Sequence, residues 1–276
     1  MQRNRDRRGG KLMQLLDLSI PLSNDIPADP PFQPVSIDYT DHAAGAELMA
    51  AAFPGLRSAD LPEGQGWAVE RLSLSTHNGT HMDAPWHYHP TMDRGQHALT
   101  IDEIPLDWCM RPGVRLDFRD RLDGHVVTPD EIDAELERIG HVLTPLEIVL
   151  CATRAGERYG NVDYIHSGCG FGRDATLHLT RQGIRVVGTD AWSWDPPFSA
   201  TQRRFAAEGD PSIIWEGHKA GREIGYCQLE KLHRLEQLPP DGFTVICFPV
   251  NVERASAGWT RAVAVLEEPS TGQSTA

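Results

Sequence analysis

Apolar runs of strand length recur along this chain with helical patterns between some of them, and no other feature constrains its fold as strongly. Runs of four to eight apolar-rich residues bounded by turn residues are typical of strands. The runs lie at 15–20, 69–76, 113–118, 146–153, 184–190, 243–250 and 261–267. Because strands and helices alternate, we predict an α/β fold with a mixed sheet.

The clearest helical pattern begins at Thr128. Thr128 and Glu131 have the spacing of a capping box, and Pro129 occupies the first helical position. This helix is predicted to end at Gly140. A second helix is predicted over 173–183.

The segment 21–66 is rich in proline, glycine and alanine. We predict a long loop here, with one short helix near 45–53, and long loops in compact domains often cover active sites. We predict a single domain over 13–267. Disordered tails are expected at 1–12, which is basic, and at 268–276.

Charge and composition exclude several classes of protein. The formal net charge is −13 and the pI is about 5.3, so a nucleic-acid backbone would be repelled. No apolar run is long enough to cross a membrane, and the basic start lacks the apolar core of a signal peptide. Five scattered cysteines form no CxxC pair. We therefore expect a soluble, cytoplasmic protein that binds neither nucleic acid nor membrane.

The stretch STHNGTHMDAPWHYHP, residues 75–90, is unusually rich in metal-binding side chains. His77, His81, Asp83 and His87 fall within eleven positions, and five of the twelve histidines lie between residues 77 and 97. Imidazole and carboxylate together suit zinc, manganese or iron, and the absence of nearby thiolates argues against a closed structural zinc site. We favour a catalytic metal site over a polar surface loop.

The local sequence does not favour a helix for this stretch. Asn78 and Gly79 favour a turn, and Pro85 keeps the preceding residue out of the helical region. The preceding residues alternate like a strand. We predict a strand that ends in a curled loop, which would bring the imidazoles and the carboxylate to one point.

The sequence HNGTHMDAPWH, residues 77–87, resembles the HxGTHxDxPxH signature of the cyclase-type metal-dependent hydrolases. This family includes isatin hydrolase, a trans-dienelactone hydrolase and bacterial kynurenine formamidase. The similarity extends from about residue 15 to about 267, and GTDAWSWDPPF at 188–198 looks like the isatin hydrolase branch. The resemblance implies a single α/β domain with a barrel-like sheet and flanking helices, assembled as a homo-oligomer, a dimer or a tetramer.

The resemblance also assigns roles to individual residues. His77, His81 and Asp83 would bind the metal, and His87 would face its water or a second metal. A later segment, 215–232, would complete the site with His218 and with Glu230 or Gln228. In an extended strand Gln228 and Glu230 point to the same side, so the sequence leaves both open as ligands.

These residues predict hydrolysis of a small-molecule substrate. One or two divalent ions, Mn2+ or Zn2+, would activate a water that opens a cyclic amide or lactone. His87, and after it His218, is the candidate acid–base residue. One alternative is an arylformamidase acting on N-formylkynurenine. The other is a non-catalytic protein that binds a metal or a small ligand. Such a protein would not need His87 in addition to a complete set of metal ligands.

Other residues near the signature are less constrained. Trp86 lies between Asp83 and His87 and is our candidate substrate wall, with core packing as the alternative. Asp190 and Asp195 are consistent with loop caps or with partners of a histidine ligand. No serine-hydrolase elbow or phosphate loop is present.

Overall fold

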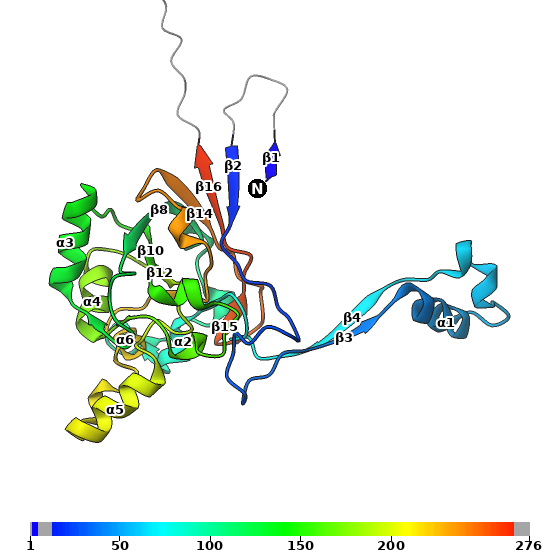
Figure 1. Cartoon of the computed structure of the whole chain (residues 1–276), viewed down its shortest axis with the longest axis horizontal. Helices are drawn as coiled ribbons and strands as arrows, with labels where there is room; N and C mark the ends of the chain where they lie inside the picture. The colour runs from blue at the N-terminus through cyan, green and yellow to red at the C-terminus, as the bar shows by residue number, and fades with distance from the viewer. Residues whose placement is uncertain (1, 5–12, 268–276) are drawn as a thin grey trace, which may run out of the picture.

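A computed structural model describes residues 2–4 and 13–267 of the chain. The centre of the fold is one mixed sheet of ten strands (Figure 1). The strand order is β1-β2-β16-β14-β8-β10-β12-β13-β5-β15. The strands are β1 (Gln2–Asn4), β2 (Met13–Asp17), β16 (Val263–Glu267), β14 (Phe243–Ile246), β8 (Met110–Asp117), β10 (Ile148–Ala152), β12 (Val186–Thr189), β13 (Cys227–Glu230), β5 (His81–Asp83) and β15 (Ala257–Trp259). Strands β8, β10, β12 and β13 are parallel, and the pairs outside them are antiparallel. The predicted α/β class with a mixed sheet is confirmed.

The sheet curls toward a barrel. An antiparallel bridge joins Ser19, just after β2, to Leu232, just after β13. The backbone NH of His233 also donates to the carbonyl of Leu18 at 2.8 Å. Because β2 and β13 are far apart in the strand order, these contacts bring the two halves of the sheet together.

Both faces of the parallel strands are covered. Alternate residues of β10 point to opposite sides, Ile148 and Leu150 into one apolar core and Val149 and Cys151 into the other. Helices α3 (Pro129–Ile139) and α4 (Arg173–Arg181) cover the second core. Burial on both faces explains why these strands read as continuous apolar runs.

The predicted elements are present with small shifts at their ends. Every predicted strand segment contains a strand, and Thr128 and Glu131 form the expected capping box of α3. Gly140 ends α3 with φ of 68°, a conformation that glycine adopts without strain. The remaining α-helices are α1 (His42–Ala52), α2 (Pro85–Tyr88), α5 (Phe198–Glu208) and α6 (Glu216–Ala220).

The prediction for residues 21–66 needs a correction. Residues 36–73 form an arm, in which β3 (Ser36–Thr40) and β4 (Val69–Ser73) make an antiparallel ribbon and α1 lies at its far end (Figure 1). The loop interpretation failed because the partner of the 69–76 run is β3, whose sequence SIDYT carries little apolar signal.

Short strand pairs and 3-10 helices lie outside the main sheet. Two further strand pairs are β6 (Thr91–Met92) with β7 (Gln96–His97) and β9 (Val126–Val127) with β11 (Gly170–Phe171). Short 3-10 helices cover 58–60, 62–64, 101–103, 106–108, 154–158, 164–166, 211–213 and 235–237.

The predicted tails fall mostly outside the described residues. Residues 2–4, which we predicted as part of a disordered tail, form strand β1 against β2. Residues 1, 5–12 and 268–276 are not described. Among the residues that are, no helix combines the length and apolarity needed to cross a bilayer. All five cysteines are buried and unpaired with one another.

Candidate metal centre

Two neighbouring strands place four polar side chains on one face of the sheet. In the antiparallel pair of β13 and β5, Gln228 lies opposite Asp83 and Glu230 opposite His81. Residues two apart on a strand, and residues directly opposite each other, share a face. All four side chains are buried, so this face carries a polar cluster inside the protein.

Three other segments bring histidines to this face. His77 belongs to a turn in which the Asn78 side chain accepts a hydrogen bond from the Ser75 NH at 2.6 Å. Gly79 in the same turn has φ of 62°, which favours glycine. Helix α2 carries His87 and helix α6 carries His218. The predicted curled loop is confirmed for His77, whereas His81 and Asp83 lie on a strand.

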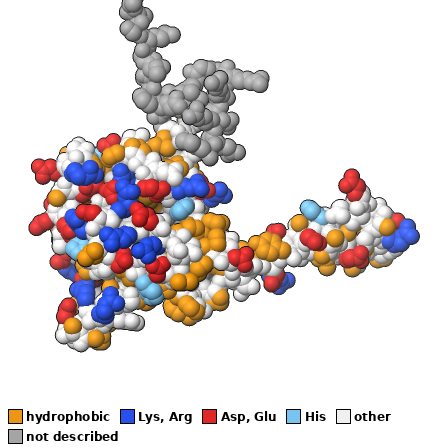
Figure 2. Space-filling view, in the orientation of Figure 1, with side chains coloured by type: hydrophobic (Ala, Val, Ile, Leu, Met, Phe, Trp, Pro, Cys, Tyr) orange, Lys and Arg blue, Asp and Glu red, His pale blue; other side chains and the backbone are white. Residues whose placement is uncertain are grey.

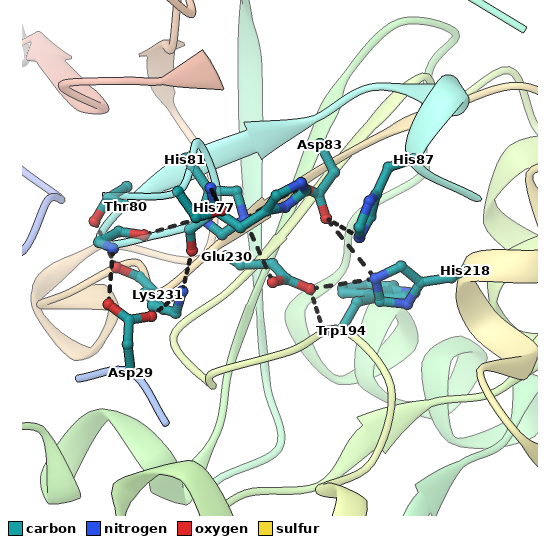
Figure 3. A network of polar contacts seen from close by, with 12 residues as sticks. Asp29, His77, Thr80, His81, Asp83, His87, Trp194, His218, Glu230 and Lys231 are labelled. Atoms are coloured by element: carbon teal, nitrogen blue, oxygen red, sulfur yellow. Dashed lines mark hydrogen bonds and ion pairs between the residues drawn. The ribbon is translucent and has the colours of Figure 1, made fainter. Parts of the chain in front are cut away.

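The polar atoms of these side chains converge (Figure 3). Asp83 Oδ1 lies 2.8 Å from His77 Nδ1 and 3.1 Å from His81 Nε2. Asp83 Oδ2 lies 3.9 Å from His87 Nε2 and 3.8 Å from His218 Nε2.

Glu230 closes the cluster from the other strand. Its two oxygens lie 3.6 Å from His81 Nε2 and 3.6 Å from His218 Nε2. Two groups with the spacing of metal ligands result, His77–Asp83–His87 and His81–Asp83–Glu230. Asp83 belongs to both, so its two oxygens could serve either one ion or two.

Hydrogen bonds to the outer ring nitrogens orient two of the histidines. His81 Nδ1 lies 2.9 Å from the Gly79 carbonyl, and His218 Nδ1 lies 2.5 Å from Asp195 Oδ2. Each bond fixes the ring and directs Nε2 into the cluster, which is the usual arrangement of a metal-binding histidine. Trp215 also stacks on the His218 ring with centroids 4.4 Å apart.

Several atoms at the centre of the cluster are buried without a hydrogen-bond partner among the described residues. They are His81 Nε2, both carboxylate oxygens of Asp83 and Gln228 Oε1. Leaving such atoms unpaired costs roughly 1–3 kcal/mol each, and more for a charged group. A divalent cation would satisfy these atoms together, so the residues present fit a metal.

Burial and mutual charge shift the pKa values of the cluster. Burial opposes the ionisation of Asp83, but the neighbouring histidines outweigh it and hold the pKa of this carboxyl well below its ordinary value. Burial lowers the pKa of His87 to about 3. At His218 burial is outweighed by the hydrogen bond to Asp195 and by the negative charges of Asp195 and Glu230, which raise the pKa to about 10. Burial, and then the charge of Asp83, raises the pKa of Glu230.

A cavity of about 220 Å3 opens beside the cluster. Its polar side is formed by His77, His87, His218, Glu230 and Lys231, and its apolar side by Phe32, Trp192, Phe198 and Trp215. Sites for drug-sized ligands measure roughly 300–1,000 Å3, so this cavity suits a smaller molecule. Flat aromatic walls favour a planar one.

The family model described as putative cyclase matches residues 16–196 of this chain, which is more than half of its length. The chain belongs to this cyclase family. The match includes His77, His81, Asp83 and His87 and ends before His218 and Glu230. The structure therefore adds the second half of the polar cluster to what the family match covers.

Two kynurenine formamidases are similar to this chain in sequence. The one from Paracidovorax citrulli (strain AAC00-1) is 27% identical over 236 residues, covering 81% of this chain and 94% of that protein. The one from Erythrobacter litoralis (strain HTCC2594) is 24% identical over 212 residues, covering 77% and 83%.

Solved structures of isatin hydrolases share the fold of this chain. An isatin hydrolase bound to the product analogue thioisatinate superposes with a TM-score of 0.70 at 20% identity and covers 93% of each chain. Isatin hydrolase A from Labrenzia aggregata, bound to benzyl benzoate, gives a TM-score of 0.68 at 23% identity and covers 93% of this chain and 94% of its own. The predicted barrel-like fold is confirmed by this likeness.

The structure distinguishes residues that the sequence left equivalent as site residues. Glu230 lies among the histidines, while the Gln228 amide nitrogen donates to the Tyr226 hydroxyl. Asp195 contacts His218, whereas Asp190 accepts hydrogen bonds from Thr153 and lies outside the cluster.

The position of Trp86 does not support its predicted contact with substrate. Its side chain is 39% exposed, its ring lies 5.5 Å from that of His97, and it is not part of the cavity wall. The prediction rested on closeness in sequence, but helix α2 turns Trp86 and His87 to different sides. Trp192 and Trp215 form the wall instead.

Lys231 and Asp29 form a buried pair beside the site that the sequence pattern does not predict. The buried Lys231 ammonium lies 2.7 Å from Asp29 Oδ1 and donates to the His77 carbonyl at 2.6 Å (Figure 3). This pair joins the loop before the arm to the turn that carries His77. The only sequence signal was a lysine next to Glu230 in an apolar strand.

Proposed function

We propose that this protein is a metal-dependent hydrolase that opens a cyclic amide or lactone in a small, planar substrate. The observation that carries the proposal is the convergence of buried, unpaired nitrogen and oxygen atoms beside an aromatic cavity. Unpaired buried polar atoms destabilise a fold, so their presence at a cavity indicates function.

His77, His81, Asp83 and Glu230 would hold the metal, with Gln228 Oε1 as a further oxygen within the same buried face. Mn2+ and Zn2+ both accept such a mixture of imidazole and carboxylate ligands. When bound, a divalent metal lowers the pKa of a coordinated water and polarises a carbonyl group. Because Asp83 belongs to both ligand groups, one ion or two can be accommodated.

His87 is the proposed acid–base residue. Burial lowers its pKa to about 3, so the ring is neutral at physiological pH and would hold a transferred proton only transiently. His87 also forms part of the cavity wall, so it can pass that proton to the leaving nitrogen or oxygen of a substrate. His218, held by Asp195, would act as a ligand or stabilise charge rather than shuttle protons.

The aromatic side of the cavity would orient the substrate. Trp192 and Phe198 pack edge to face with ring centroids 5.1 Å apart, and Trp215 stands against His87 with centroids 4.9 Å apart. A flat ring bound against these walls would present its carbonyl to the polar side. This geometry favours a compact cyclic substrate of the isatin or dienelactone type.

Hydrolysis of N-formylkynurenine is the second candidate. The similarity of this chain to two kynurenine formamidases over most of their length favours it. The small volume of the cavity favours the cyclic substrate, because N-formylkynurenine carries an additional amino-acid side chain.

The deciding experiment is ultraviolet-monitored hydrolysis of isatin and of N-formylkynurenine, each with Mn2+ or Zn2+ and each with a chelator. We expect the protein to hydrolyse isatin. A chelator should abolish this activity, and added metal should restore it. Turnover of N-formylkynurenine alone would favour the second candidate. If neither substrate is hydrolysed, lactones are the next substrates to test.

His81→Ala and His89→Ala provide a matched pair for the metal. His89 belongs to the same stretch, but its ring bonds to Thr91 and lies outside the cluster. We expect His81→Ala to lose stoichiometric metal and all hydrolysis while His89→Ala keeps both. A purified protein that binds metal in the wild-type form but hydrolyses no amide or lactone would instead be a binding protein.

A further inference from the structure

A basic cleft of about 1040 Å3 opens on the body of the protein and shares no wall residue with the cavity beside the polar cluster. Its wall is formed by α2, α4, α6 and the segments that follow α2 and α6. The surface over α4 and α6 carries Lys and Arg side chains with acidic ones among them (Figure 2). The basic residues of the cleft are Arg94, Arg173, Arg181, Lys219 and Arg222. The cleft is thus locally basic in a chain whose formal net charge is −13.

The protein itself neutralises only a small part of this positive charge. The cleft contains two acidic residues, Glu216 and Glu223. Glu223 pairs with Arg173 at 2.6 Å, and Glu216 pairs with Arg204 of α5 at 3.2 Å. The basic residues of the cleft that form no ion pair with a described carboxylate are Arg94, Arg181, Lys219 and Arg222. A cleft lined by charges of one sign concentrates ions of the opposite sign, so this cleft attracts an anion.

The unpaired charges match the chemistry of phosphate groups. Three of the four are guanidinium groups, whose planar fork donates two parallel hydrogen bonds to a phosphate. A phosphate monoester carries a charge of about −1.5 to −2 at pH 7, so two phosphate groups supply about three to four negative charges. These charges balance the four cations.

The rest of the wall suits the body of a small molecule. Thr91 and Ser212 contribute hydroxyl groups, and Tyr88 and Ile224 contribute apolar surface. Ligand sites in proteins measure roughly 300–1,000 Å3, so the cleft has room for a molecule as large as a nucleoside diphosphate. A nucleic acid fits less well, because its backbone would extend beyond the cleft onto a protein of strongly negative net charge.

We propose that this cleft is a binding site for a small molecule with two phosphate groups, separate from the candidate metal centre. The guanidinium groups of Arg94, Arg181 and Arg222 and the Lys219 ammonium would hold the phosphates. These side chains are exposed, so they can close around a ligand without breaking an existing ion pair.

The cleft and the candidate site share two helices, a link that rests on the proposed function. On α2, Tyr88 lines the cleft while His87 lines the cavity. On α6, Lys219 lines the cleft while His218 lines the cavity. The Tyr88 ring lies 5.3 Å from the His218 ring, and a Cβ added at Gly221 would lie 2.4 Å from a Tyr88 ring carbon. Because these groups are closely packed, a ligand in the cleft would change how the two histidines are held.

Calorimetric titration with ADP, pyrophosphate and adenosine tests the site. We expect ADP and pyrophosphate to bind with an affinity that falls as the salt concentration rises, and adenosine not to bind at about 1 mM. Arg181→Gln and Arg222→Gln should each weaken ADP binding about tenfold or more, because each removes a charge-assisted hydrogen bond. Arg203→Gln is the matched control, since Arg203 is exposed on α5 outside the cleft wall and should leave ADP binding unchanged.

His81→Ala separates the cleft from the candidate metal centre. A phosphate group can also bind a metal ion, so loss of ADP binding in His81→Ala would place ADP at the metal centre and overturn the proposal. We expect this variant to bind ADP as the wild type does. The proposal would also be overturned if neither ADP nor pyrophosphate binds, if Arg203→Gln weakens binding as much as Arg181→Gln, or if citrate binds more tightly than pyrophosphate. Binding is measured without hydrolysis, so failure of the proposed function would leave these results intact.

Trp215 can report the link between the cleft and the site. It directly precedes α6 and stacks on the His218 ring with centroids 4.4 Å apart. We expect ADP to change the tryptophan fluorescence of the wild type. Trp215→Phe should lose this change while it keeps ADP binding. An unchanged fluorescence of the wild type at saturating ADP would show that the cleft does not act on the site.

Discussion

The Asp195 carboxylate accepts a hydrogen bond from His218 Nδ1 at 2.5 Å and also accepts from the backbone NH groups of Gly217 and His218 at 2.8 and 2.9 Å. Asp195 follows β12, whereas His218 lies on α6, so this contact joins two segments that are distant in sequence. The three bonds fix both the start of α6 and the ring that it carries. The carboxylate therefore determines where His218 Nε2 lies relative to Asp83.

Asp195→Asn should weaken metal binding about 10- to 100-fold, as is usual when the partner of a metal-binding histidine is changed. The amide keeps the shape of the side chain but removes the charge that aligns the ring. Calorimetric titration with Mn2+ or Zn2+ measures the effect. Asp174→Asn is the control, because that side chain is 80% exposed and pairs with Arg173. Equal affinities for the two variants would contradict an orienting role of Asp195.

The distal ligand can be identified by comparing Glu230→Gln with Gln228→Met. Glu230 Oε1 accepts a hydrogen bond from the Trp194 NH at 2.9 Å, and a glutamine can keep this bond while losing the negative charge. Because the Glu230 oxygens lie 3.6 Å from both His81 Nε2 and His218 Nε2, we expect Glu230→Gln to lower the metal content of the purified protein more than Gln228→Met does. Elemental analysis by mass spectrometry gives the ratio, and the opposite order would make the Gln228 amide the ligand.

The sequence predicted the half of the site whose residues are close together along the chain. His77, His81, Asp83 and His87 lie within one stretch, and their spacing limits how far apart the side chains can be. The other half depends on the pairing of β13 with β5, which aligns Glu230 with His81 across about 150 residues of chain. Strand pairing at such separation leaves no trace in the local pattern, so Gln228 and Glu230 were indistinguishable before the structure.

The position of the arm, residues 36–73, could not be predicted from the sequence. The run at 69–76 was correctly predicted as a strand, but its place outside the main sheet was not. An apolar run indicates that a segment needs to be covered, and it does not say whether the cover comes from the same chain. On the ribbon of residues 36–73, Tyr39 and Leu72 stay exposed, so among the described residues nothing covers these two side chains.

The buried pair of Lys231 and Asp29 should be important for stability. Both side chains are almost fully buried, at 2% and 6% exposure, so removing one charge leaves the other without compensation. Lys231→Met should lower the free energy of unfolding by about 3–5 kcal/mol. Urea denaturation monitored by circular dichroism measures this loss.

A double-mutant cycle separates the pair from general damage. Asp29→Asn with Lys231→Met removes both charges, so the double variant should lose less stability than the sum of the single changes. Arg254→Met is the control, since Arg254 pairs with Glu253 on the surface and should change stability by only about 0.5 kcal/mol or less. Additive losses in the cycle would show that the two charges do not stabilise each other.

The pH dependence of stability should report on Asp190. Burial raises the pKa of this carboxyl from 3.8 to about 8, against the hydrogen bonds from the Thr153 hydroxyl and NH that favour its ionised form. The folded state then holds a proton that the unfolded chain releases near pH 4, so the contribution of Asp190 is greatest below that pH. This contribution declines as the pH rises from about 4 to about 8, and it changes little above that range. Asp190→Asn cannot ionise and should lack this decline. Urea midpoints measured at about pH 5, 7 and 9 should therefore fall more steeply for the wild type than for the variant, and parallel curves would mean that Asp190 is already ionised in the folded protein at pH 5.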